Sequence, residues 1–133
     1  MLALQPLDRT AALALVRRFL DAIAAMDFDS AADMLSEDGI VEMPFGPKPA
    51  PVEGREAMRE SFKHDVPLFL ARIAFTIERA TFDLEEQRLV VEYESDGALV
   101  DGRPYRNRYI GTWDFRGQAI AQWREYYNPL KLA

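Results

Sequence analysis

The sequence predicts an α+β fold, with helices in the first part of the chain and an antiparallel sheet in the second. Two observations predict it. Apolar residues recur with helical spacing up to about residue 64, and from residue 71 they alternate with polar residues at every second position. The 133 residues suit a single hydrophobic core, so residues 1–133 are expected to form one domain.

The first helix is expected to open at Asp8 or Thr10 and to end near Met26-Asp27. Its apolar residues fall on one side: Leu13, Val16, Phe19, Leu20 and Ile23. A helix with one apolar side must bury that side, and here it is expected to cover one face of the sheet.

Two further helices are expected. Asp29-Ser30 caps a short one, Ala31 to Leu35, which Asp38-Gly39 stops. The third runs from Arg55 to about His64. Pro67 is expected to end it, because proline has no N–H to continue the hydrogen-bond ladder.

A short strand, Gly39 to Phe45, lies between the second and third helices. The segment after it, residues 46–54, holds three prolines between two glycines, which predicts an irregular loop. Such a loop is suited to form the rim or lid of a cavity.

Two strands follow the third helix: Ala71 to Phe82 and Arg88 to Ser95, joined by a turn at Asp83 to Gln87. The second strand alternates Leu89, Val91, Tyr93 and Ser95 against charged residues. Asp96-Gly97 and Asp101-Gly102 mark the turn region before the last two strands.

The segment from Tyr105 to Pro129 predicts a long hairpin with a three-residue turn at Arg116-Gly117-Gln118. That register gathers an aromatic set on one face: Tyr105, Asn107, Tyr109, Gly111, Trp113, Phe115, Ala119, Ala121, Trp123, Glu125 and Tyr127. The polar face takes the residues between them, Ile120 included. A two-residue turn would instead mix aromatic and charged residues on both faces. Glu125, opposite Tyr109, is the one formal charge on the aromatic face.

Composition excludes several classes of function. The net charge of −6 argues against a nucleic-acid or anionic-membrane surface. Without cysteine there is no disulfide, thiolate metal site or cysteine nucleophile, and a single histidine cannot build a multi-histidine site. No signal-peptide pattern opens the chain and no uncharged run reaches membrane-spanning length, so a cytoplasmic protein is expected. No cofactor motif is present, and no cofactor or metal is expected.

The order of elements and several local motifs resemble the SnoaL-like, or nuclear transport factor two-like, superfamily. The local marks are Leu35 to Asp38 with Val41 to Pro44, then Val52 to Glu56, and the terminal Trp-Arg-Glu-Tyr-Tyr-Asn-Pro of residues 123–129. The resemblance implies a cone-shaped half-barrel: three helices on a curved antiparallel sheet, a deep pocket between them, and a homodimer formed through the sheet.

Three branches of that superfamily differ in what they imply. The ketosteroid isomerases place an Asp base, a Tyr and a second Asp where this chain is matched by Met43, Phe19 and Gly111, so their usual site is missing. The limonene-epoxide-hydrolase type resembles residues 123–126, with Glu125 in place of Asp. Its Arg-x-Asp pair would fall near Tyr93 and Ser95, so the pair that supports water activation in that type is missing.

The phenazine-biosynthesis A/B type gives the closest local match, through Tyr105-x-Asn107 and the segment from Arg124 to Pro129. That resemblance implies that Glu125 is an acid/base group. In the predicted register Tyr109 lies directly opposite Glu125 and Asn107 on the diagonal, so one or the other is expected to orient it by a hydrogen bond. His64 would be a second such group if it points inward. The residues expected to contact a ligand are Tyr93, Tyr105, Asn107, Tyr109, Trp123, Tyr127, Phe19 and Met43.

Two functions stay open. The first is a cofactor-independent isomerase or lyase that acts on a small, apolar, ring-containing metabolite through Glu125. The second is a non-catalytic module that binds a small ligand or serves in dimerisation, with Glu125 held by Arg or Tyr partners. The charges on the outer face of the sheet are either a solvated surface or a matched dimer interface.

Overall fold

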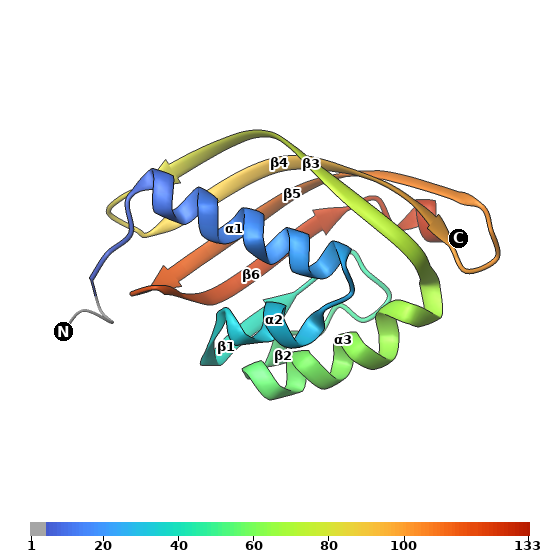
Figure 1. Cartoon of the computed structure of the whole chain (residues 1–133), viewed down its shortest axis with the longest axis horizontal. Coiled ribbons are helices and arrows are strands. Elements are labelled where there is room, and N and C mark those ends of the chain that lie inside the picture. The colour runs from blue at the N-terminus through green and yellow to red at the C-terminus, as the bar shows by residue number, and fades with distance from the viewer. Residues whose placement is uncertain (1–4) are drawn as a thin grey trace.

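In the computed structural model, which describes residues 5–133, three helices lie on one face of a six-stranded sheet that is not closed (Figure 1). The helices are α1 (Arg9–Ala24), α2 (Phe28–Asp33) and α3 (Arg55–Phe69), with a short 3-10 helix, η2 (Pro129–Leu132), at the end. The strands are β1 (Leu35–Glu42), β2 (Val52–Glu53), β3 (Leu70–Asp83), β4 (Arg88–Leu99), β5 (Pro104–Arg116) and β6 (Ala119–Tyr127).

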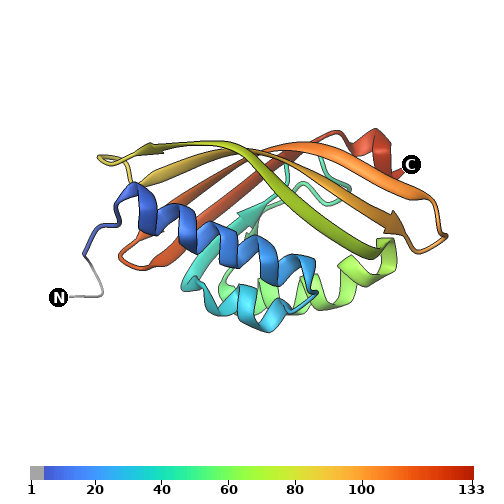
Figure 2. The ribbon, with the colours of Figure 1, turned by 45° about the horizontal axis from the view of Figure 1, so that its top comes forward.

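The strand order is β2-β1-β6-β5-β4-β3. All neighbouring strands are antiparallel except β1 and β6, which are parallel, so the sheet is mixed where an antiparallel one was expected. Figure 2 shows the long strands β3 to β6 curving over α1 and α3. The predicted α+β fold is confirmed, with the core between the concave face of the sheet and the helices.

The first two helices begin at aspartate caps. The Asp8 carboxylate accepts a hydrogen bond from the backbone N–H of Ala11 at 2.8 Å, which decides between the two predicted starts of α1. The predicted start of α2 is wrong by three residues. Asp27, not Asp29-Ser30, is the cap, and it accepts from the N–H of Ser30 at 3.1 Å.

The predicted end of α3 is also wrong, because the helix includes Pro67 and continues to Phe69. Proline has no N–H, so the helix loses one backbone hydrogen bond at Pro67. The loss costs little in the last turn, because few backbone hydrogen bonds of the helix remain to be formed beyond it. The extra turn places Val66, Leu68 and Phe69 beside the cavity described below.

Two strands differ from the prediction. β1 begins at Leu35 rather than Gly39, and the loop over residues 46–54 contains the two-residue strand β2, which pairs with β1. β4 runs through Asp96-Gly97 to Leu99, where a turn was predicted. A Cβ on Gly97 would lie 2.3 Å from the carbonyl oxygen of Arg72, so this glycine serves close strand contact rather than a turn.

The last hairpin has a two-residue turn, Gly117-Gln118, in place of the predicted three. Phe115 pairs with Ile120 and Asp114 with Gln122, which leaves one extra residue, Ala121, as a β-bulge. The bulge shifts the register by one residue, so that Trp113 pairs with Trp123.

Because of that bulge, the aromatic residues still share one face of the sheet although the turn is one residue shorter than predicted. Tyr105, Tyr109, Trp113, Trp123 and Glu125 are all buried on the helix side, as predicted. The predicted place of Ile120 is wrong: it is fully buried, while Ala119 and Ala121 are only partly buried.

On the opposite face of the sheet, charged side chains pair across strands. Arg79 pairs with Glu92, Arg106 with Asp96, Arg108 with Glu78, and Arg124 with Glu42. Each such surface pair is worth at most about 1 kcal/mol. Within residues 5–133, no helix has the length and apolar character needed to cross a membrane.

Candidate functional site

A cavity of about 330 Å³ lies between the concave face of the sheet, α3 and the loop that follows β1. Its wall is mostly apolar. The residues that surround it from the sheet side and from α3 include Val41, Met43, Phe62, Val66, Ile73, Phe75, Tyr105, Tyr109, Trp123, Glu125 and Tyr127. The volume lies in the range of small-molecule sites.

Glu125 is the carboxylate at the inner wall of this cavity, and only 6% of it is exposed. The Tyr93 phenol donates a hydrogen bond to its Oε2. Among the described residues, no Lys, Arg or His forms an ion pair with Glu125, and Oε1 has no hydrogen-bond partner. Burial raises the pKa of Glu125 to about 7, while the hydrogen bond from Tyr93 acts in the lowering direction.

Tyr93 reaches Glu125 across an intervening strand. Tyr93 is on β4 and Glu125 on β6; on β5 between them, Gly111 pairs with Glu125. A Cβ on Gly111 would lie 3.0 Å from Cε1 of Tyr93 and 2.5 Å from Cζ3 of Trp113. The missing side chain therefore leaves the space through which the Tyr93 ring passes.

The predicted partners of Glu125 were Tyr109 and Asn107, and that prediction is wrong. Tyr109 pairs through its hydroxyl with Ser95 Oγ at 2.7 Å. Asn107 donates from Nδ2 to the Tyr105 hydroxyl at 2.8 Å and to the Asn128 carbonyl at 2.9 Å. These polar groups satisfy one another beside Glu125, because the shifted register sets Tyr109 opposite Tyr127.

The charge on Glu125 acts on the phenols around it. Burial raises the pKa values of Tyr93, Tyr109 and Tyr127, and the negative charge of Glu125 raises them further. These phenols therefore stay neutral and can act only as hydrogen-bonding groups at neutral pH.

The expected ligand contacts fall into two groups. Met43, Tyr105, Tyr109, Trp123 and Tyr127 line the cavity. The other three, Phe19, Tyr93 and Asn107, do not line it. Phe19 is fully buried and packs edge-on against Trp123 with ring centroids 4.9 Å apart.

His64 lies at the mouth of the cavity, and its side chain is 77% exposed. Its Nδ1 is 2.8 Å from Oδ1 of Asp65, and Lys48 from the loop after β1 reaches Oδ2 of the same aspartate at 3.0 Å. The inward-pointing second acid/base group that the sequence allowed is thus not formed by His64.

Sequence reasoning missed part of the cavity wall. Phe62, Val66, Ile73 and Phe75 line it, and all four carry a signal in the sequence: apolar spacing on α3 and alternation on β3. The partnership of Tyr93 with Glu125 has no local signal, since 32 residues separate them.

Within residues 5–133, no group of three or more His, Asp or Glu side chains is arranged to hold a metal ion.

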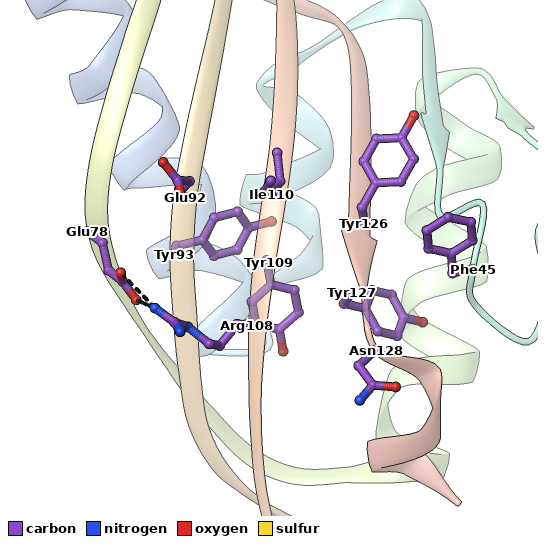
Figure 3. A pocket seen from close by; sticks show the side chains of 10 residues that line it. All are labelled: Phe45, Glu78, Glu92, Tyr93, Arg108, Tyr109, Ile110, Tyr126, Tyr127 and Asn128. Atoms are coloured by element: carbon purple, nitrogen blue, oxygen red, sulfur yellow. Dashed lines mark hydrogen bonds and ion pairs between the residues drawn. The ribbon is translucent and has the colours of Figure 1, made fainter.

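The outer face of the sheet carries a separate, shallow depression of about 460 Å³. Figure 3 looks onto this face with the helices behind it, and it shows Arg108 of β5 reaching across β4 to pair with Glu78 of β3. Two exposed apolar side chains, Phe45 and Ile110, lie beside the depression, and the Phe45 ring packs against Tyr126 with centroids 5.6 Å apart.

The helices, the open sheet and the cavity between them define an α+β protein of the nuclear transport factor two-like fold. Residues 16–123 match the family model described as the SnoaL-like domain, and the chain belongs to this family. A curated relative, the uncharacterized protein YesE of Bacillus subtilis (strain 168), is 28% identical over 118 residues, which cover 86% of this chain and 80% of YesE.

Solved structures share the fold. A crystal structure of a Bacillus subtilis protein, described provisionally as an isomerase, has 26% identity and a TM-score of 0.82, covering 92% of this chain and 89% of that one. The phenazine biosynthesis-related protein PhzB2 of Pseudomonas aeruginosa has a TM-score of 0.78 at 14% identity, over 96% of this chain and 84% of PhzB2. The predicted resemblance to the superfamily is confirmed.

Proposed function

We propose that this SnoaL-like protein binds a small, largely apolar, ring-containing metabolite in the cavity and moves a proton on it through Glu125. The reaction would be an isomerisation or elimination that needs no cofactor. One observation carries the proposal: a single carboxylate, buried among aromatic residues, whose pKa is raised to about 7. A general acid/base works best when its pKa lies near the working pH.

In such a reaction the Glu125 carboxylate would take a proton from a carbon of the ligand, and the resulting acid would return it to another atom. Tyr93 keeps Oε2 engaged. Oε1 is left to face the ligand, so one oxygen is held while the other exchanges the proton. The two steps together leave the enzyme unchanged.

The test is turnover by the Glu125→Gln variant. A ligand that co-purifies with the protein would first be identified by native mass spectrometry and then used as substrate. The variant keeps the shape and removes the proton exchange, so turnover should fall by about 100-fold or more. Glu60→Gln, which removes the same charge from an exposed position on α3, is the matched control. Unchanged turnover in Glu125→Gln would refute the catalytic role.

The second candidate is a binding module without chemistry. The outward position of His64 favours it, because no histidine then lies beside Glu125 as a second proton-transfer group. In that case the co-purified ligand would be recovered unchanged after prolonged incubation with the wild-type protein.

The same proposal includes a homodimer formed through the outer face of the sheet. Phe45 and Ile110 are 58% and 47% exposed there, beside ion pairs that two copies could exchange. An Ile110→Glu variant should sediment as a monomer at concentrations where the wild type is a dimer. A wild type that sediments as a monomer at every concentration would contradict the dimer.

A further inference from the structure

The charge of Glu125 limits the class of ligand that can bind beside it. A buried carboxylate is normally paired with a cation or neutralised by a proton. Glu125 has one neutral partner, Tyr93, and no ion pair with any described residue. A cation that offsets the charge of Glu125 therefore has to belong to the ligand.

The walls around Glu125 suit a cation. Seven aromatic side chains line the same cavity: Phe62, Phe69, Phe75, Tyr105, Tyr109, Trp123 and Tyr127. The electron-rich face of an aromatic ring attracts a cation, and a desolvated site makes that attraction stronger. The rings are close neighbours, since the centroids of Phe62 and Trp123 are 6.0 Å apart and those of Phe75 and Tyr109 are 5.9 Å apart.

Two hydroxyl donors near the carboxylate are already engaged. Tyr93 donates to Glu125, and the Tyr109 hydroxyl is paired with Ser95. The buried Nε1–H of Trp123, which also lines the cavity, has no hydrogen-bond partner and is open to an acceptor, whereas an N–H group would find Oε1 of Glu125 open. Of these two groups only the carboxylate carries a charge, so a cationic N–H group gains more from the cavity than a neutral acceptor does.

The charged residues at the mouth of the cavity do not repel a cationic ligand. Lys48, the lysine at the mouth, is paired with Asp65 at 3.0 Å, so its charge is offset. The net charge of −6 on the whole chain attracts positive ligands over longer distances.

From these contacts we infer that the cavity takes a ligand with a basic nitrogen: a protonated amine, attached to a ring or other apolar body, whose N–H donates to Oε1 of Glu125 while the aromatic rings surround it. The inference rests on the proposed function only in sharing its cavity. It adds that Glu125 meets the bound ligand as a carboxylate, and therefore acts first as a base.

Two probes of nearly the same shape test this. Benzylamine is cationic at neutral pH and benzyl alcohol is neutral. With a pKa of about 7 for Glu125, the carboxylate fraction rises about tenfold between about pH 6 and about pH 8. Benzylamine should therefore bind about tenfold more tightly at the higher pH, measured by tryptophan fluorescence or calorimetry. Benzyl alcohol should not show this rise.

The wild-type protein gives an independent readout. Near pH 7, an amine that selects the carboxylate should release about half a proton, and a ligand that selects the acid should take up about half a proton. Calorimetry in two buffers of different ionisation enthalpy measures the sign. Glu125→Gln should lose the preference for benzylamine and its pH dependence, while Glu60→Gln should keep both.

The outcomes separate the two proposals. Equal binding of both probes at every pH, or proton uptake with benzylamine, would overturn the amine inference. Tighter binding of benzyl alcohol below pH 7, lost in Glu125→Gln, would overturn it while leaving Glu125 as the acid/base group of the proposed function. Failure of both probes to bind would contradict the amine inference and count against a ligand cavity.

Discussion

The Tyr93 phenol donates a hydrogen bond to Oε2 of Glu125 from two strands away, and the two residues meet above a glycine of the strand between them. Gly111 occupies the position matched to the second Asp of the ketosteroid isomerases. In this chain the space above it is filled by the rings of Tyr93 and Trp113. Two aromatic rings therefore pack beside Glu125 at the place where those enzymes carry their second Asp.

Replacing Tyr93 by Phe should raise the pKa of Glu125 above its value of about 7, because the hydrogen bond that favours the carboxylate is removed. The loss of a buried hydrogen bond should also lower the free energy of unfolding by about 1–2 kcal/mol. Carbon-detected NMR of the glutamate carboxyls would measure the titration. Tyr126→Phe, on the outer face, is the control, and an unshifted Glu125 in Tyr93→Phe would contradict the assigned role.

Stability should fall as the pH rises, through Glu125. Its pKa is raised from 4.5 in the unfolded chain to about 7 in the fold, so its neutral form favours the folded state. The loss accumulates between about pH 4.5 and about pH 7 and is complete above that, at about 3 kcal/mol. Measured by urea unfolding, the free energy of Glu125→Gln minus that of the wild type should rise by this amount. A difference that does not change with pH would show that Glu125 is not buried as described.

Gly111→Ala should destabilise the fold by about 1–3 kcal/mol, because the added methyl would meet the Tyr93 and Trp113 rings and the core must move. If the Tyr93 ring is displaced, the Glu125 pKa should rise as it does in Tyr93→Phe. Combining the two substitutions should then raise that pKa no further. Additive pKa shifts would mean that Gly111 and Tyr93 act separately.

The ion pair at the mouth of the cavity predicts a change in the rate of ligand release. Asp65 holds Lys48 of the loop after β1 to α3, and Asp65→Asn weakens that tie. Because the pair is largely exposed, the cost in stability should stay within about 1 kcal/mol. Ligand release, followed by stopped-flow fluorescence, should become several-fold faster. An equal release rate would show that this ion pair does not restrain the loop.

The sequence was sufficient for the fold because alternation and helical spacing are local signals. The inward residues of β4, from Leu89 to Ser95, and the aromatic residues of β5 are buried as their alternation predicts. The isolation of Glu125 on an aromatic face followed from the same rule, and its raised pKa follows from its burial.

The features of the site that the sequence did not predict depend on strand register and on contacts between residues far apart in the chain. The partner of Glu125 comes from β4, which no local pattern indicates. The outward position of His64 is set by the side of α3 on which residue 64 falls, and the predicted helix left that side open. Alternation indicated that Ile73 and Phe75 face inward, but which inward residues border the cavity depends on how β3 packs against α3.

The bulge at Ala121 also bears on how chain length varies among related hairpins. Removing that one residue would leave Trp113 opposite Trp123 and Gly111 opposite Glu125, since the extra residue opposes no partner of its own. Removing Arg124 instead would force either Trp123 or Glu125 away from the cavity, because side chains alternate along a strand. A one-residue gap in an alignment of such hairpins therefore belongs at the bulge. Placed beyond it, the same gap would equate a cavity carboxylate with a surface one.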